Sequence, residues 1–154
     1  MNRRYALKYA GISALGLGLS SRLAQAFEIT KSDADWKKQL TPAQFAVLRE
    51  ENTESPNSSA LLEEHREGTF ACAGCDLPLF ASTTKYDSGT GWPSFYEALP
   101  KAVGTKEDNT LFSTRTEVHC SRCGGHLGHV FDDGPKPTGL RYCMNGAALK
   151  FVPV

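Results

Sequence analysis

Hydrophobic and polar residues alternate most regularly over residues 111–118, which follow an Asp108-Asn109 turn. One face of this segment would carry Phe112, Thr114, Thr116 and Val118, and the other Ser113, Arg115 and Glu117. A period of two over this length predicts a half-buried β-strand. Residues 140–142 and 149–152 are two further short strand candidates.

Signals for helices are confined to the first third of the chain. The run Thr41-Pro42-Ala43-Gln44 has the form of a capping box with proline at the first helical position, which predicts a short helix through Leu48. The polar segment 50–59 predicts an extended surface chain that Leu61 and Leu62 anchor to the core. Because no long 3.6-residue period follows residue 70, the pattern predicts a mainly β fold.

The first 26 residues have the pattern of an export signal. They begin with the basic run NRRYALK, continue with the uncharged residues 9–21, and end with Ala24-Gln25-Ala26. A membrane anchor is the alternative, but the uncharged run is shorter than the roughly 20 apolar residues that span a bilayer. We therefore expect cleavage after Ala26, and the paired arginines resemble a twin-arginine signal that directs a folded protein to the periplasm.

Composition fits one domain over residues 27–154. The first 26 residues hold four basic residues and no acidic one, so the remaining chain keeps 13 of the 17 basic residues and all 17 acidic residues, a net charge of −4. This mildly acidic balance argues against a nucleic-acid partner, and we expect no stable membrane span after cleavage.

Four of the five cysteines form two C-x-x-C pairs, Cys72 with Cys75 and Cys120 with Cys123. Each pair can present two thiolates to one tetrahedral ion, so the sequence predicts one structural Zn²⁺ held by all four. Export leaves disulfides or redox C-x-x-C motifs as alternatives. A C-x-x-C disulfide closes a very small loop, however, and constrains the unfolded chain little.

The fifth cysteine, Cys143, has no C-x-x-C partner. It is either a small buried hydrophobic residue or a reactive thiol, and Arg141 on the same strand face favours a thiolate. His126 and His129 lie in a glycine-rich run and are free for acid–base chemistry if the four paired cysteines hold the metal, although both could be structural.

A Gly/Pro-rich turn, YDSGTGWPSF, carries two aromatic residues, Trp92 and Phe95. They could form the apolar wall of a small binding site or belong to the ordinary core. An apolar wall, two histidines and a lone thiol suit a small substrate with one polar atom.

These motifs together resemble the methionine-(R)-sulfoxide reductase (MsrB) family. The matching segments are CAGCDLPLF, YDSGTGWPSF, HCSRCGGHLGHVFDDGP and GLRYCMNGAALKF, in family order, with TPAQFAVLRE and a TE-P segment before them. The resemblance implies two antiparallel sheets with short N-terminal helices, a Cys₄ zinc site and Cys143 as the nucleophile.

The resemblance also implies roles for the surrounding residues. His126 or His129 would protonate the sulfoxide oxygen while Cys143 attacks the sulfur, and Cys143 would become a sulfenic acid. Trp92, with Phe95 and Phe131, would hold the substrate. Asp133, Arg141 and Asn145 would form the polar network around the thiolate.

Thr90 marks a departure from much of the family, in which a resolving cysteine occupies this position. Threonine cannot form an intramolecular disulfide, so the sequence predicts recycling by an external thiol reductant, either a thioredoxin-like protein or a small thiol. Oxidised methionine in proteins or peptides is the expected substrate. The rival hypothesis is a zinc-stabilised binding module in which Cys143 is merely packed.

Overall fold

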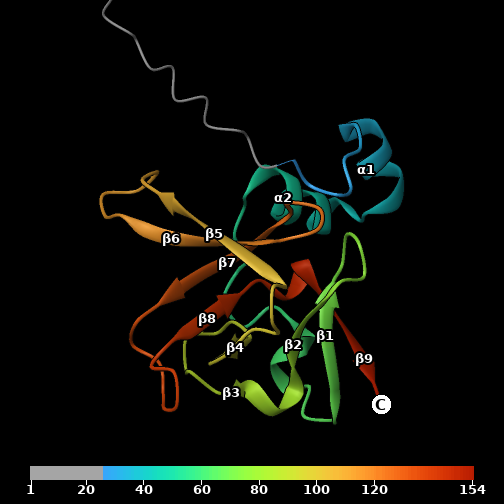
Figure 1. The fold of residues 1–154 in the computed structure, drawn as a ribbon. Coiled ribbons are helices and arrows are strands. Elements are labelled where there is room, and N and C mark those ends of the chain that lie inside the picture. Colours follow the sequence, from blue (N-terminus) through green and yellow to red (C-terminus); the bar gives the residue numbers. More distant parts are fainter. Residues whose placement is uncertain (1–25) are drawn as a thin grey trace, which may run out of the picture.

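The computed structural model describes residues 26–154, so the predicted signal segment falls outside the described residues except for Ala26. Two helices, α1 (Asp33–Gln39) and α2 (Pro42–Glu50), lie together at one end of the molecule (Figure 1). None of the helices within residues 26–154 has the length and apolar character needed to cross a membrane.

Helix α2 begins where the capping box predicts. The Thr41 hydroxyl accepts from the Gln44 amide at 3.2 Å, and the Thr41 amide donates to the Gln44 side chain at 3.0 Å. The helix ends at Glu50, and the left-handed backbone of the next residue, Glu51 (φ 57°), turns the chain. Sequence patterns did not predict α1, a polar helix of 7 residues whose one buried side chain is Trp36.

Within residues 26–154, nine strands and three short 3-10 helices make up the rest of the regular secondary structure. The strands are β1 (Gly68–Cys72), β2 (Pro78–Ala81), β3 (Lys85–Tyr86), β4 (Ser94–Phe95), β5 (Val103–Asp108), β6 (Arg115–Cys120), β7 (His126–Phe131), β8 (Arg141–Met144) and β9 (Leu149–Pro153). The 3-10 helices are η1 (Ala60–Glu63), η2 (Ser82–Thr84) and η3 (Gly146–Ala148).

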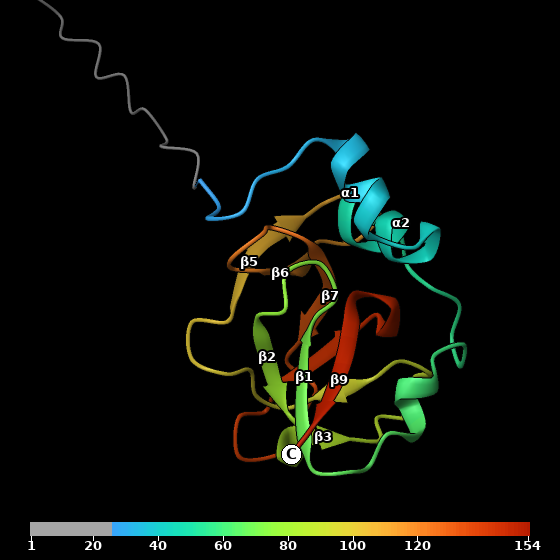
Figure 2. The ribbon, with the colours of Figure 1, turned by 90° about the vertical axis from the view of Figure 1, so that its right-hand side faces the viewer.

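The strands form two antiparallel sheets, which confirms the predicted fold class. One sheet has the order β2-β1-β9 and the other β3-β4-β8-β7-β6-β5. Figure 2 shows β1 and β9 side by side, with the two helices beyond the end of this sheet. The predicted strands near residues 140–142 and 149–152 correspond to β8 and β9.

The strand predicted over residues 111–118 is correct only in its second half. Strand β5 ends at Asp108, which pairs with Arg115, so residues 109–114 form the connecting loop and Phe112 is fully exposed. The predicted polar face is also wrong at Glu117, which is 3% exposed. Its carboxylate is buried because it pairs with a histidine on β7, a contact that alternation along one strand cannot reveal.

Aromatic side chains from both sheets fill the core. Phe80 of β2 stacks on Phe95 of β4 with ring centroids 4.4 Å apart, and Phe70 of β1 meets Phe95 edge-on at 5.0 Å. Phe95 is completely buried in this cluster. The expectation that Phe95 lines a substrate site is therefore wrong, because its ring joins the two sheets instead.

Candidate functional site

The four paired cysteines meet where the two sheets end. Cys72 is the last residue of β1 and Cys120 the last of β6, and each is followed by its partner three residues later. All four sulfur atoms lie within 4.8 Å of one another. The Sγ atoms of Cys72 and Cys123 are 3.8 Å apart, and those of Cys75 and Cys120 are 3.5 Å apart.

These distances fit one shared metal ion. Sulfur atoms at ~2.3 Å from a tetrahedral ion lie about 3.8 Å from one another. A disulfide would require about 2.05 Å between two sulfur atoms. The thiol donors are mostly buried and converge on one point, so the arrangement can hold a metal and does not form disulfides.

The backbone positions both cysteine pairs in the same way. The Asp76 amide donates to the Cys72 carbonyl and the Gly124 amide to the Cys120 carbonyl, each at 2.9 Å, and both donors have left-handed backbones. Helix α2 covers the site, and its Arg49 donates to the Cys123 carbonyl at 3.0 Å. The cluster therefore ties β1 of one sheet to β6 of the other.

Cys143 lies in a different place, on β8 in the middle of the six-stranded sheet. His129 of β7 is its direct cross-strand partner, so both side chains point to the same face. This face opens into a small pocket of about 130 Å³. The pocket is lined by Thr53, Trp92, Arg115, Gly128, His129, Phe131, Cys143 and Asn145.

Gly128 is required next to Cys143. A Cβ atom at this position would lie 2.1 Å from the Cys143 carbonyl oxygen, so any side chain would push β7 and β8 apart. The glycine-rich run thus brings His129 close to Cys143 through backbone contact. It does not provide flexibility at this position.

Two carboxylates orient the two histidines. His129 Nε2 lies 2.7 Å from Asp108 Oδ2, and His126 Nδ1 lies 2.7 Å from Glu117 Oε1. The imidazole rings are 5.5 Å apart, edge to face; His129 lines the Cys143 pocket and His126 does not. Asp108 and Glu117 were not predicted, because only the register of β5 against β6 and of β6 against β7 brings them to the histidines.

Burial lowers the pKa of both histidines. For His126, loss of water is the main cause; for His129, the same effect is opposed by the hydrogen bond to Asp108. Hydrogen bonds from Thr110 and His129 lower the pKa of Asp108 well below its usual range, so this carboxylate is ionised. Each histidine has a second ring nitrogen that does not face a carboxylate, and that of His126, Nε2, is buried without a hydrogen-bond partner among the described residues.

Arg141 and Asp133 flank the pocket without lining it. The Arg141 guanidinium makes two hydrogen bonds of 2.8 Å to the Asp133 carboxylate. The same guanidinium lies 4.3 Å from the ring centroid of Phe131. Arg141 therefore holds Phe131 against the pocket and carries a positive charge on the strand of Cys143.

Glu54 connects three parts of the site. Its carboxylate accepts from the first two amides of η3 at 2.6 and 2.9 Å, and its own amide donates to the Asn145 side chain at 3.0 Å. Its carbonyl accepts from the Trp92 indole N–H at 3.1 Å. Glu54 belongs to the TE-P segment, but no local pattern predicted its role.

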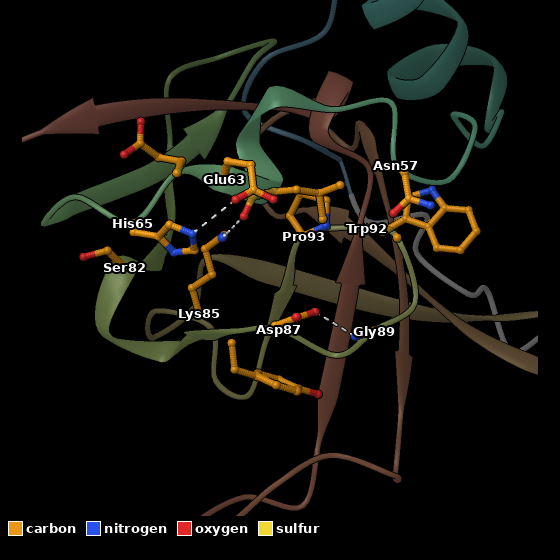
Figure 3. A pocket seen from close by; sticks show the side chains of 13 residues that line it. Asn57, Glu63, His65, Ser82, Lys85, Asp87, Gly89, Trp92 and Pro93 are labelled. Carbon is orange, nitrogen blue, oxygen red and sulfur yellow. Dashed lines mark hydrogen bonds and ion pairs between the residues drawn. The ribbon is translucent and has the colours of Figure 1, made fainter.

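A second, larger hollow of about 500 Å³ shares Trp92 with the Cys143 pocket (Figure 3). Several of its charged groups already have partners: His65 lies 3.7 Å from Glu63, and Lys85 donates to a backbone carbonyl at 2.8 Å. Cys143, His126 and His129 do not line this hollow. The thiol and the buried imidazoles therefore meet at the smaller pocket.

The pocket brings together most of the residues singled out in the sequence. Cys143, His129, Trp92, Phe131 and Asn145 line it, His126 lies next to His129, and Arg141 and Asp133 lie beside it. Arg115 and Thr53 also line it; the sequence placed Arg115 on the polar face of a strand and Thr53 in the TE-P segment, and predicted neither as a pocket residue. A thiol, an imidazole and two aromatic rings around one small cavity can bind an apolar group and transfer a proton to a neighbouring polar atom.

Comparison with known proteins agrees with this arrangement. Residues 40–153 match the SelR domain family. A peptide methionine sulfoxide reductase MsrB of Leptospira interrogans is 55% identical over 126 residues, which cover 81% of this chain and 96% of the relative. MsrB proteins of Agrobacterium fabrum and Leifsonia xyli are 53% and 56% identical, over 82% of this chain and 95% and 93% of their own.

Proposed function

Because this chain belongs to the MsrB family of peptide methionine (R)-sulfoxide reductases, we propose that Cys143 is the nucleophile of this reduction and cycles through a sulfenic acid. One observation carries the proposal: Cys143 shares a single small pocket with His129, Trp92 and Phe131. The competing hypothesis, a binding module in which Cys143 is merely packed, does not account for a pocket beside the Cys143 thiol.

The substrate's methyl group lies against Trp92, whose indole is fixed by its bond to the Glu54 carbonyl, and Phe131 forms the facing side. The sulfoxide sulfur is then next to Cys143 and its oxygen is next to His129. Asn145, buried and hydrogen-bonded on both ends of its amide, fixes the end of β8 that carries the nucleophile.

The Cys143 thiolate attacks the sulfoxide sulfur while protonated His129 donates to the oxygen, which weakens the S–O bond. The protonated oxygen then passes from the substrate sulfur to the Cys143 sulfur: the S–O bond to the substrate and the transient S–S bond break, and the substrate sulfur keeps the electron pair. Methionine leaves, neutral His129 remains, and Cys143 is a sulfenic acid that has lost the two electrons gained by the substrate sulfur. The Asp108 carboxylate, 2.7 Å from His129 Nε2, favours the protonated form of His129 and opposes the effect of burial on its pKa.

Recycling requires two external thiols. The first condenses with the sulfenic acid and releases water, and the second reduces the mixed disulfide and frees Cys143. No thiol of this chain is placed to form a disulfide with Cys143 among the described residues, because the other four cysteines gather at the shared site and the residue beside Cys143 is Thr90. A thioredoxin-like protein or a small thiol therefore serves as reductant. The export-signal pattern of the first 26 residues supports a periplasmic location, where the substrates are oxidised proteins.

We infer that the metal of the Cys₄ cluster is Zn²⁺. A closed set of four thiolates suits zinc, leaves no position for a substrate, and gives the ion a structural role. Cys72, Cys75, Cys120 and Cys123 would hold it at the junction of the sheets. The ion supplies no group to the reaction at Cys143.

Turnover of the separate R and S epimers of a capped methionine sulfoxide, with dithiothreitol as reductant, tests the proposal. Wild type should reduce only the R epimer, and Cys143→Ser should reduce neither. A reagent that traps sulfenic acids should label wild type after one turnover at Cys143 and nowhere else. Activity that survives in Cys143→Ser, or equal reduction of both epimers, would overturn the assignment.

A further inference from the structure

Three hydroxyl groups form a continuous chain that ends at the Cys143 sulfur. Thr90 Oγ1 lies 3.8 Å from Cys143 Sγ, Ser88 Oγ lies 2.8 Å from Thr90 Oγ1, and Ser94 Oγ lies 2.7 Å from Ser88 Oγ. Sulfur forms longer hydrogen bonds than oxygen because its radius is larger. We call these three residues, Thr90, Ser88 and Ser94, the hydroxyl chain.

The turn that carries Thr90 is held in place by its neighbours. The Asp87 carboxylate accepts from the Gly89 amide at 2.8 Å, across the turn seen in Figure 3. The Gly91 carbonyl accepts from the Asn57 amide at 2.8 Å. Gly91 has a φ of 93°, and a Cβ there would lie 2.8 Å from a proline side chain. The Thr90 hydroxyl is thus directed at the sulfur by the backbone of this turn.

The far end of the hydroxyl chain is buried. Ser94 is 1% exposed and is the cross-strand partner of Cys143 on β4. Its hydroxyl donates to the Trp92 carbonyl at 3.1 Å when the chain points away from the sulfur. A buried hydroxyl needs such partners, because leaving it without one costs about 1–3 kcal/mol.

Each hydroxyl has one hydrogen, so the chain can point in only two directions. When Cys143 is a thiol, its S–H donates to Thr90, Thr90 to Ser88, Ser88 to Ser94, and Ser94 to the Trp92 carbonyl. When Cys143 is a thiolate, Thr90 can turn its hydrogen toward the sulfur, and Ser88 and Ser94 can follow. No atom moves in this reversal apart from the hydroxyl hydrogens.

We propose that Thr90, supported by Ser88 and Ser94, donates a hydrogen bond to the Cys143 thiolate, and that the hydroxyl chain reverses its direction when Cys143 loses its proton. The inference rests on the proposed function, because it gives the hydroxyl chain a role at that nucleophile. The same donor serves twice in one cycle: it stabilises the attacking thiolate, and it stabilises the thiolate that leaves when the mixed disulfide is reduced.

Alkylation of Cys143 by iodoacetamide measures the thiolate directly, without turnover. The reaction is followed over pH by mass spectrometry of the peptide that contains Cys143. Thr90→Val keeps the shape of the side chain and removes the hydroxyl, so alkylation at pH 7 should slow roughly threefold and the profile should move to higher pH. Thr90→Ser should keep the wild-type profile. Thr83→Val, an exposed threonine in η2, is the matched control.

A second variant tests the chain as a unit. Ser94→Ala should shift the alkylation profile in wild type but not in Thr90→Val, because Ser94 acts only through Thr90. Additive shifts, no shift from Ser94→Ala, or an unchanged profile in Thr90→Val would each overturn the inference. Near-ultraviolet circular dichroism of each variant checks that the aromatic core is intact.

The two proposals fail in different ways. If wild type reduces neither epimer, the reductase mechanism fails while the alkylation profiles still report on the hydroxyl chain. If wild type is active and R-specific but Thr90→Val alkylates like wild type, only the role of Thr90 is wrong.

Discussion

Cysteine side chains occur in two parts of the molecule, the cluster of four cysteines and the Cys143 pocket, and the surroundings of the thiols differ between them. The cluster's four sulfurs gather at one point from two short sequence motifs, and buried turns fix them. Cys143 is half-buried, faces a cavity, and depends on partners from β4, β5, β7 and the segment around Glu54. The four cysteines that can hold a metal are thus surrounded by one another, whereas the proposed nucleophile is surrounded by an imidazole, aromatic rings and an amide.

The largest contrast should come from Cys143→Ser. We expect activity to fall by at least about a thousandfold, because serine is a far weaker nucleophile at neutral pH. The midpoint of thermal unfolding should change by no more than about 3 °C, since the side chain is only half-buried and its volume is nearly kept. Activity and differential scanning calorimetry on one preparation check both statements, and a large drop in thermal stability would undermine the contrast.

Cys120→Ser should give the reverse pattern. The buried sulfur is part of the cluster, so its loss weakens metal binding and costs roughly 4 kcal/mol of folding free energy or more. Metal content by mass spectrometry and urea unfolding measure the effect, and removal of metal from wild type with a strong chelator should reproduce it. Full stability without metal would show that the fold does not depend on the cluster.

Within the pocket, His129→Gln should lower kcat about a hundredfold through loss of the general acid. The matched control is His65→Gln, because His65 is exposed and its ion pair with Glu63 is 3.7 Å long. Stability should be nearly equal in the two variants. Equal rates in both would remove His129 from the reaction and leave His126 as the proton donor.

Glu54→Gln should have a smaller effect on both properties. The carboxylate receives two backbone hydrogen bonds at η3, and replacing its charge with an amide costs about 1–2 kcal/mol of stability. Because Trp92 is bonded to the backbone of Glu54, KM should rise more than kcat falls. Glu63→Gln, at an exposed carboxylate outside the pocket, is the control. A variant that loses kcat alone would contradict a positioning role.

The smallest effect concerns pH and stability. Burial lowers the pKa of His126 and His129 in the folded state, while in the unfolded chain both titrate near 6.5. Below about 6.5 the unfolded state binds protons that the folded state does not, so stability falls as pH decreases, by at most ~1.4 kcal/mol per histidine per pH unit. Asp108 contributes only at more acid pH, since its pKa is also lowered.

Urea unfolding of wild type and His126→Gln between pH 7.5 and 5.5 checks this. The variant should lose less stability over this range, and the metal cluster, common to both proteins, cancels in the difference. Identical slopes would mean that His126 does not contribute.

Residues whose partners are close in sequence could be predicted, and the others could not. The capping box at Thr41 and Gln44 predicted α2 because its two partners are three positions apart. The C-x-x-C spacing predicted each cysteine pair in the same local way, and the need of a tetrahedral ion for four ligands joined the two pairs, although their contacts span 45 and 51 positions. Asp108 and Glu117 depend on the register of β5 against β6 and of β6 against β7, which no local pattern contains. The core position of Phe95 was missed for the same reason, since an aromatic residue in a turn motif suits a core as well as a pocket.

The cluster of four cysteines also determines which part of the chain would bear a stretching force. With an ion bound, a force applied to the two ends passes from Cys72 to Cys123 through metal–sulfur bonds, so the segment between them carries no load. That segment includes Trp92 and Thr90, while Cys143 lies outside it. Under stretching, the roughly 50 residues between the two cysteines, about 170 Å of extended chain at ~3.4 Å per residue, would be released only after the metal–sulfur bonds rupture.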